Sequence, residues 1–248
     1  MSTVAIAGDW HGSTAWAVGV IEEAAAAGAD RLLHLGDFGV WPGPAGGRYL
    51  DDVDAALDRA GMALWFVDGN HEDHGRLARL PRNPNGYSDV RDRIKHLPRG
   101  YRWEWHGRTW LALGGAVSLD RAVRTEGRDW WPEEEIAPWQ AEQIASKGRA
   151  DVMLTHECPA RVAHSFPSPP SWWDLKYLAR NDVHRERLQY VVDRVHPSWL
   201  FHGHLHRAYD RVTAMPHGDV RIVGLDCDGA LFGNWMLLDT KTMEPVTA

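Results

Sequence analysis

The chain has 248 residues and a net charge of −7, and its composition is 44% hydrophobic and 25% charged. This length allows one large domain or two small ones, and the acidic balance argues against strong non-specific nucleic-acid binding, which needs a basic surface. Two cysteines do not make a disulfide framework, and no apolar run approaches the roughly 20 residues of a membrane helix. The first residues read as a strand and not as a signal peptide, so we expect a cytoplasmic protein with no membrane partner.

The first third of the chain alternates between predicted strands and predicted helices. Short apolar runs predict strands at residues 4–7, 31–35 and 63–67, and the segments between them predict helices at residues 14–27 and 49–60. This alternation is typical of a layered α/β domain with parallel strands.

The remainder of the chain is richer in predicted strands. Strands are predicted at residues 94–97, 101–105, 109–113, 152–154 and 199–201, helices at residues 133–146 and 185–195, and a run of strands over residues 207–239. Residues 157–182 are rich in Pro, Ser and Trp and predict an ordered, lid-like insertion. The sequence contains no internal repeat or linker, so we expect a single domain over residues 1–248.

Polar clusters directly follow five of the predicted strands. They are Asp9 with His11, Asp37, Asn70 with His71, His156, and His204 with His206. In open α/β sheets, ligands bind beyond the carboxyl ends of the strands, so we expect these side chains to converge in one cavity. The alternative for each carboxylate or amide taken alone is that it caps a helix or shapes a turn.

The side chains in these clusters have the chemistry of metal ligands. Imidazole suits zinc and iron, and its mixture with carboxylate and amide oxygens also admits manganese. Seven ligands are too many for one tetrahedral ion and suit two ions, which the two oxygens of Asp37 could bridge. Paired divalent ions stabilise the attacking and leaving oxygens of a phosphate displacement and lower the pKa of bound water. We therefore expect two divalent ions, with manganese favoured over iron or zinc.

Five short sequence blocks resemble the signature of a known family. The blocks are Gly8-Asp9-Trp10-His11-Gly12, Gly36-Asp37, Gly69-Asn70-His71-Glu72, Thr155-His156 and Gly203-His204-Leu205-His206. In type and order they resemble calcineurin-like metallophosphoesterases, in particular small single-domain members of bacterial or phage type. The resemblance implies an α/β sandwich (αββα) of two mixed β-sheets packed face to face, with helices outside. It also implies hydrolysis of a phosphate monoester or diester by a metal-bound hydroxide.

The resemblance assigns three side chains to each of two metal ions and one side chain to both. The sets are Asp9, His11 and His206 for the first ion, Asn70, His156 and His204 for the second, and Asp37 as the bridge. His71 would face the substrate, either as general acid for the leaving oxygen or as a stabiliser of transition-state charge. The catalytic residues would then be His71, Asp37 and Asn70.

The second block departs from the protein Ser/Thr phosphatases of this superfamily. Those enzymes usually continue to Asp-Arg-Gly, whereas residues 36–41 here read GDFGVW. The phosphate-gripping arginine of that branch has no counterpart at this place, which argues against a phosphoprotein phosphatase. Arg121 or Arg124 could replace it, and Asp120 could orient a ligand histidine, although a surface ion pair would also explain either arginine.

The substrate and the partners are less determined by the sequence. A nucleotide or a nucleic-acid end is a candidate substrate, and a metal-dependent nuclease or an inactive protein-binding scaffold are alternative functions. The pairs Trp130/Trp131 and Trp172/Trp173 would either pack in the interior or stack on a nucleobase. His74 could be a site residue or a solvated loop residue. The oligomeric state is not predicted.

Overall fold

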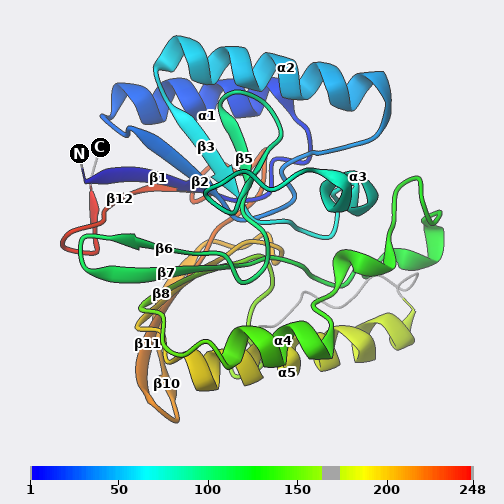
Figure 1. Ribbon diagram of the computed structural model, residues 1–248, viewed down its shortest axis with the longest axis vertical. Helices are drawn as coiled ribbons and strands as arrows, with labels where there is room; N and C mark the ends of the chain where they lie inside the picture. Colours follow the sequence, from blue (N-terminus) through cyan, green and yellow to red (C-terminus); the bar gives the residue numbers. More distant parts are fainter. Residues whose placement is uncertain (1, 164–173, 247–248) are drawn as a thin grey trace.

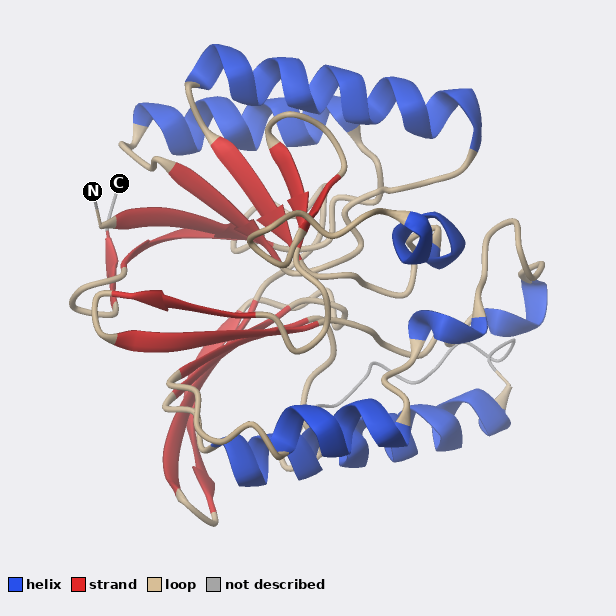
Figure 2. Cartoon of the chain, in the orientation of Figure 1, coloured by secondary structure: helices blue, strands red, loops and turns tan. Residues whose placement is uncertain are grey.

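Two mixed β-sheets face each other at the centre of the structure, and helices cover their outer sides (Figure 1, Figure 2). The computed structural model describes residues 2–163 and 174–246. Its architecture confirms the predicted α/β sandwich. Within these two ranges, no helix combines the length and the apolar character needed to cross a membrane.

The first sheet has seven strands in the order β13-β12-β1-β2-β3-β5-β4. They are β1 (Thr3–Ala7), β2 (Arg31–His34), β3 (Ala63–Phe66), β4 (Ser88–Asp89), β5 (Ile94–His96), β12 (Trp235–Asp239) and β13 (Glu244–Val246). Strands β1, β2, β3 and β5 run parallel, so their carboxyl ends lie at one edge of the sheet. Strand β12 pairs with β1 in the antiparallel sense, which joins the end of the chain to its beginning.

The second sheet has six strands in the order β10-β11-β9-β8-β7-β6. They are β6 (Arg102–Trp105), β7 (Arg108–Leu113), β8 (Val152–Thr155), β9 (Trp199–His202), β10 (Tyr209–Met215) and β11 (Gly218–Gly224). Strands β7, β8, β9 and β11 are parallel. Their carboxyl ends face the same side of the molecule as those of β1 to β3 (Figure 1), so loops from both sheets meet there.

Each sheet has its own pair of helices on its outer face (Figure 1). Helices α1 (Thr14–Ala26) and α2 (Gly43–Ala60) cover the first sheet, and α4 (Pro138–Ala145) and α5 (Leu175–Val195) cover the second. A short helix, α3 (His74–Arg79), and two 3-10 turns at Arg121–Val123 and Pro132–Glu134 follow strands on the side where the carboxyl ends meet.

Alternation of side chains along the strands divides the core into three layers. In β1, Ala5 and Ala7 belong to the layer under α1 and α2, whereas Val4 and Ile6 belong to the layer between the sheets. A third layer fills the space between the second sheet and the helices α4 and α5. Because the central strands are buried on both faces, their ends are fixed supports for the loops that follow.

Two helices in the first two thirds of the chain differ from their predicted bounds. Helix α2 begins at Gly43, inside a Gly/Pro segment that reads as a loop, with a proline in its first turn, where a missing N–H is tolerated. The helix predicted over residues 133–146 is instead a 3-10 turn followed by α4. Pro138 breaks the continuity, because proline lacks the N–H that an uninterrupted helix needs.

Helix α5 also begins earlier than predicted, at Leu175. Asp174 caps it by accepting the backbone N–H of Lys176 at 2.9 Å. The last part of the predicted lid, from residue 175 on, is therefore helical. Residues 164–173 of that segment, with Trp172 and Trp173, lie outside the described residues.

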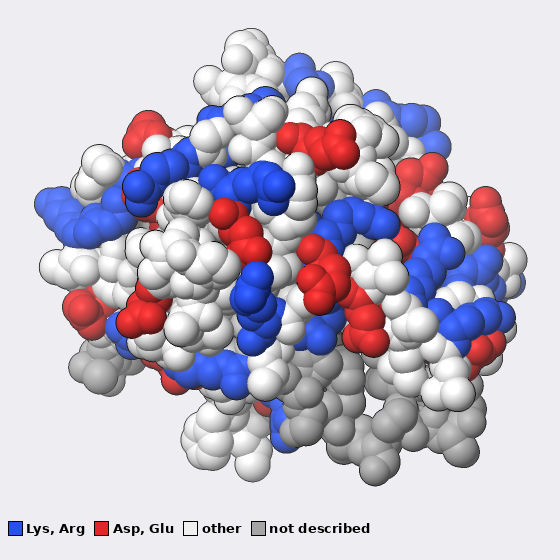
Figure 3. Space-filling model, turned by 90° about the horizontal axis from the view of Figure 1, so that it is seen from below, with Lys and Arg blue, Asp and Glu red and all other residues white. Residues whose placement is uncertain are grey.

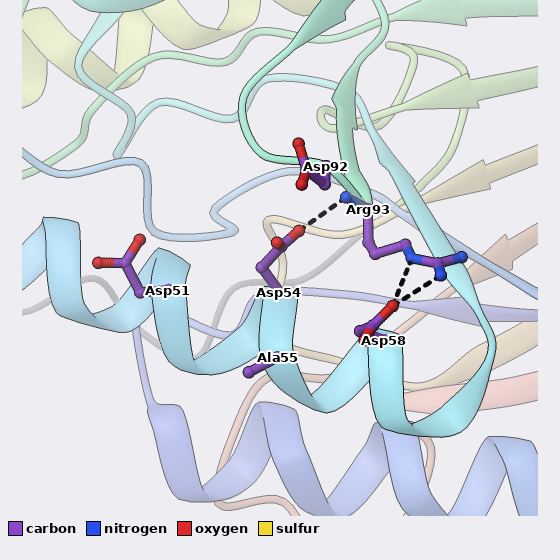
Figure 4. A pocket seen from close by; sticks show the side chains of 6 residues that line it. All are labelled: Asp51, Asp54, Ala55, Asp58, Asp92 and Arg93. Atoms are coloured by element: carbon purple, nitrogen blue, oxygen red, sulfur yellow. Dashed lines mark hydrogen bonds and ion pairs between the residues drawn. The ribbon is translucent and has the colours of Figure 1, made fainter.

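Charged side chains are visible on one face of the molecule and in a pocket beside α2 (Figure 3, Figure 4). Acidic and basic side chains are interspersed on the face next to α4 and α5 (Figure 3). The pocket beside α2 is lined mainly by carboxylates (Figure 4), but three of the four already have partners. Asp51 accepts a hydrogen bond from Nε of Arg91 at 2.7 Å. Asp54 accepts the backbone N–H of Arg93 at 2.7 Å, and Asp58 accepts its guanidinium at 2.7 Å. These contacts fasten α2 to the segment that precedes β5, which is a structural role.

Candidate metal centre

The loops that carry the predicted ligands have unusual backbone conformations. Among the described residues, eight that are not glycine have positive φ angles, and five of the eight are predicted ligands: Asp9, His11, Asp37, His204 and His206. Such conformations are uncommon, cost free energy and concentrate at functional sites. The loops are thus shaped for the placement of their side chains.

The first ligand group consists of Asp9, His11 and His206, whose ligand atoms lie within 4.8 Å of one another. Asp9 is fully buried, and its two carboxylate oxygens accept the backbone N–H of His204 at 3.0 and 3.1 Å. His206 Nε2 lies 3.8 Å from Asp9 Oδ1, and its side chain is 45% exposed. This group therefore opens to solvent on the His206 side.

The second ligand group consists of Asp37, His156 and His204, again within 4.8 Å. Nδ1 of His156 lies 2.7 Å from the carbonyl oxygen of Leu35, so in the neutral ring this nitrogen carries the proton and Nε2 is free to act as a ligand. That Nε2 is 3.1 Å from Asn70 Oδ1 and 3.4 Å from Asp37 Oδ1. Three acceptor atoms facing one another are favourable only around a positive charge, which is the condition a metal ion meets.

Asp37 lies between the two groups. Its Oδ2 is 3.5 Å from Nε2 of His11, and its Oδ1 is 3.4 Å from Nε2 of His156. The backbone N–H of His71 donates to Oδ1 at 2.8 Å and fixes the carboxylate. All seven predicted ligands therefore come together in one place, with Asp37 in the position of a bridge.

Two loops carry glycine because a carboxylate ligand lies directly against their backbone. A Cβ on Gly69 would lie 2.2 Å from Asp37 Oδ1, and one on Gly203 would lie 2.2 Å from Asp9 Oδ2. Both distances are far below a van der Waals contact, so any larger residue would displace the carboxylates.

The electrostatics of the centre favour positive charge. Burial raises the pKa of Asp9 to about 7, against the opposing pull of His156. Burial lowers the pKa of His156, but the carboxylates of Asp37 and Asp9 outweigh it and raise this pKa to about 10. Burial also lowers the pKa of His11, and contact with Asp37 more than offsets it, giving about 9. Carboxylates that hold protons on two buried histidines would also stabilise divalent cations.

The amide of Asn70 is oriented by two residues that the sequence did not single out. Its Nδ2 donates to Ser118 Oγ at 3.1 Å, and Ser118 Oγ donates to Glu134 Oε2 at 2.6 Å. Glu134 Oε1 also accepts the backbone N–H of Ser118 at 2.9 Å. This chain of hydrogen bonds leaves Oδ1 of Asn70 pointing at His156, as a ligand oxygen must.

Two further carboxylates contact the outer nitrogens of ligand histidines. Asp228 Oδ1 lies 2.8 Å from His11 Nδ1, and its backbone N–H donates to the carbonyl oxygen of Asp9. Glu157 Oε2 lies 3.5 Å from His204 Nε2, and within the described ranges neither buried atom has a hydrogen-bond partner. Such carboxylates fix the orientation of metal-binding histidines. The sequence showed Asp228 only as a turn residue and Glu157 only as the neighbour of His156.

Glu72 and His74 support the loops and do not bind in the centre. Glu72 Oε1 accepts the N–H of Phe38 at 2.7 Å, and Oε2 accepts the N–H of Gly69 at 2.6 Å, which ties the second block to the third. His74 is buried, with Nε2 3.0 Å from the carbonyl oxygen of Gly69. The structure thus resolves the open question about His74 in favour of a structural role, as a buried residue and not a solvated one.

The three candidate substrate-binding residues have different outcomes. Arg124 reaches the centre, with Nη2 2.8 Å from Nδ1 and 3.0 Å from Nε2 of His71. Asp120 holds Arg124 through two oxygens, at 2.5 and 2.6 Å, and so orients this arginine instead of the expected ligand histidine. Arg121 lies over the ring of buried Trp130, 3.7 Å from its centroid, and is engaged in packing.

The residues fit a pair of divalent cations. The two groups supply carboxylate oxygens and imidazole nitrogens, Asn70 adds an amide oxygen, and neither group contains a cysteine. This set suits manganese, iron or zinc in mixed nitrogen and oxygen coordination and does not resemble a structural thiolate zinc site.

Comparison with known proteins agrees with this geometry. Residues 2–208 match the family model described as calcineurin-like phosphoesterase. The fold is similar to TT1561 of Thermus thermophilus, with 13% identity and a TM-score of 0.57 over 100% of this chain and 98% of that one. It is also similar to a dimetal phosphatase from Danio rerio, with 13% identity and a TM-score of 0.54 over 91% of this chain and 87% of that one. No curated protein matches the chain. The family match spans every motif block, so the chain belongs to the calcineurin-like phosphoesterase family and is a hydrolase.

Proposed function

We propose that this chain hydrolyses phosphate esters with two divalent cations, preferably manganese, held where the strands of both sheets end. The observation that carries the proposal is the position of Asp37. Its two oxygens lie 3.5 Å from His11 Nε2 and 3.4 Å from His156 Nε2, so one carboxylate faces both ligand groups. This arrangement serves two cations, whereas a single group would serve one.

Each cation would have three ligands besides Asp37. The sets are Asp9, His11 and His206 for the first, and Asn70, His156 and His204 for the second. Paired cations supply Lewis acidity toward phosphoryl oxygens and lower the pKa of water toward neutrality. Hydrolysis adds water across one P–O bond: the water oxygen bonds to phosphorus, the bond to the leaving oxygen breaks, and that oxygen takes up a proton.

His71 would stabilise charge on the substrate from the side opposite the ligands. Arg124 Nη2 lies 2.8 Å from His71 Nδ1 and 3.0 Å from Nε2, so the guanidinium adjoins both ring nitrogens and suits a neutral ring that accepts at one of them. Burial lowers the pKa of His71 to about 4, and Arg124 contributes in the same direction. A neutral His71 has no second proton to give to a leaving oxygen, whereas beside the Arg124 guanidinium it would stabilise negative charge by hydrogen bonding, so the stabilising role is better supported than that of general acid.

Arg124 would supply the positive charge that the protein Ser/Thr phosphatases take from the arginine of their second block. Its guanidinium is held in place by Asp120 and adjoins His71, so it is preorganised for a phosphoryl oxygen. The substrate would be a phosphate monoester or diester, with a nucleotide or a nucleic-acid end as a candidate.

The test is turnover of p-nitrophenyl phosphate and its bis-ester by manganese-loaded protein. We expect turnover by the wild type and a loss on the order of 100-fold or more in Asp9→Ala and in His204→Ala, because each change removes a ligand of one cation. Asp219→Ala, an exposed carboxylate on β11, is the matched control and keeps its activity. Failure of the loaded wild type on both esters, or equal turnover in all variants, would contradict the proposal.

A further inference from the structure

A pocket of about 350 Å³ adjoins the metal centre. Its walls include Trp41, Trp131, His71, Arg124 and Arg128. The volume lies near the lower end of the roughly 300–1,000 Å³ typical of small-molecule sites. None of the seven metal ligands lines this pocket, so it is a neighbour of the centre and not the centre itself.

His71 connects the pocket to the metal centre. His71 Nε2 is 3.8 Å from Asp37 Oδ2, and the same ring forms part of the pocket wall. A phosphoryl group held by cations at Asp37 would therefore have its ester oxygen near His71. The organic group attached to that oxygen would extend into the pocket.

Both tryptophans are held in place by backbone that comes very close to them. A Cβ on Gly12 would lie 2.9 Å from Trp41 Cζ3, so the indole rests directly on the first metal-binding loop. A Cβ on Gly75 would lie 3.1 Å from Trp131 Nε1, so the second indole rests on the first turn of α3. Two anchored indoles, one of them 36% exposed, are available to a ligand without rearrangement.

The polar side of the pocket carries two arginines, Arg124 and Arg128, and one carboxylate, Asp129. Arg124 is fixed by its two hydrogen bonds with Asp120 and by contact with the carbonyl oxygen of Asp129 at 3.0 Å. Arg128 is exposed at the rim. Aromatic walls with a fixed guanidinium suit a planar ring, because indoles and guanidinium planes both bind π-faces.

We propose that this pocket selects phosphate esters whose leaving group carries a planar aromatic ring, an inference that rests on the proposed function. Trp41 and Trp131 are the specificity-determining residues. Aryl phosphates and nucleoside phosphates share this chemistry, and alkyl phosphates lack it.

The experiment compares kcat/KM of the manganese-loaded protein for phenyl phosphate, a nucleoside 5′-monophosphate and methyl phosphate. We expect a preference for at least one of the two ring-bearing esters over methyl phosphate. In Trp41→Ala and Trp131→Ala this preference falls on the order of 10- to 100-fold, the size expected for loss of an aromatic stacking contact. Trp41→Phe restores most of it, and Trp139→Ala, a 63% exposed tryptophan on α4, leaves the preference unchanged.

A second readout does not depend on turnover. Calorimetric titration with phenylphosphonate and methylphosphonate, neither of which can be hydrolysed, should show tighter binding of the aryl compound, reduced in Trp41→Ala. Which of phenyl phosphate and the nucleotide is preferred tells whether the ring sits directly on the phosphate or beyond a sugar. Turnover of all three esters with no preference for a ring, or with a preference that both tryptophan variants keep, overturns the inference and leaves the proposed function intact. No turnover of any ester contradicts the proposed function instead.

Discussion

The loops of the first sheet and those of the second contribute different chemistry to the centre. The first sheet provides its oxygens, Asp9, Asp37 and Asn70, which are 0%, 1% and 3% exposed. The second sheet provides only imidazoles, and these range from fully buried His156 to His206, whose side chain is 45% exposed. The oxygen ligands therefore come from the first sheet. Three of the four ligand rings come from the second sheet, and the fourth, His11, follows β1 of the first sheet.

The carboxylate ligands and the histidine rings are also held in place differently. Backbone N–H groups fix the carboxylates: that of His71 donates to Asp37, and that of His204 donates to Asp9. Each N–H comes from a loop that carries another ligand, so the carboxylates and the loops position one another. The rings of His11 and His204 instead contact side-chain carboxylates, Asp228 and Glu157. We expect removal of a carboxylate ligand to abolish the centre and removal of a ring's partner to weaken it.

The largest expected effect is that of Asp37→Asn. This change removes the charge shared by both ligand groups, and kcat/KM on an aryl phosphate should fall on the order of 1,000-fold or more, because several kcal/mol of charge stabilisation are lost. His206→Ala, which removes an exposed ring, should cost less. If kcat/KM falls no further in Asp37→Asn than in His206→Ala, the distinction between the buried carboxylates and the histidine rings is wrong.

A pH-dependent stability effect is expected at Glu134, which supports Asn70 through Ser118. Burial raises the pKa of Glu134 from 4.5 to about 7, so folding favours its protonated form. The stability from this group is complete below pH 4.5 and is lost as the pH rises toward 7, an amount of about 3 kcal/mol for a fully buried group. Glu134→Gln removes this dependence.

The measurement is urea unfolding of wild type and Glu134→Gln at several pH values between 4 and 8. Other groups titrate in both proteins and cancel in the difference. The variant should gain stability relative to wild type as the pH rises. If the free energies of unfolding of the two proteins change with pH in parallel, folding does not raise the pKa of Glu134.

The smallest of the three effects concerns the partners of the histidines. Asp228→Ala and Glu157→Gln should each weaken manganese binding by about 10- to 100-fold, the usual cost of losing a residue that orients a ligand. Manganese titration by calorimetry measures this directly, and Asp219→Ala is the control. Unchanged affinity in both variants would mean that the rings are positioned without these carboxylates.

The sequence was sufficient to predict that the candidate ligands lie together, but not which residues support them. Each ligand directly follows a short apolar run, and the parallel strands of an α/β fold bring such positions to one edge. Asp228 reaches His11 across 217 positions of the chain, from the loop before β12, which pairs with β1. Asp120 was expected to orient a ligand histidine. In the structure it instead forms an ion pair with Arg124, four positions further along the chain.

The start of helix α2 could not be predicted from the sequence either. The Gly/Pro segment before Tyr49 has weak helix propensity and reads as a loop. In the fold it forms the start of α2, and Gly46 packs so closely on the backbone of Trp41 that a Cβ there would lie 2.2 Å from its carbonyl oxygen. Tertiary contacts of this kind override local propensity, and they also place Trp41 in the pocket beside His71.

The most direct test of the central claim is the number of manganese ions bound per chain, measured by elemental analysis after saturation and removal of free metal. Two ligand groups sharing Asp37 predict two ions in the wild type and fewer than two in Asp37→Asn. A wild type that takes up one ion or none, or a variant that still holds two, would contradict the paired-cation centre.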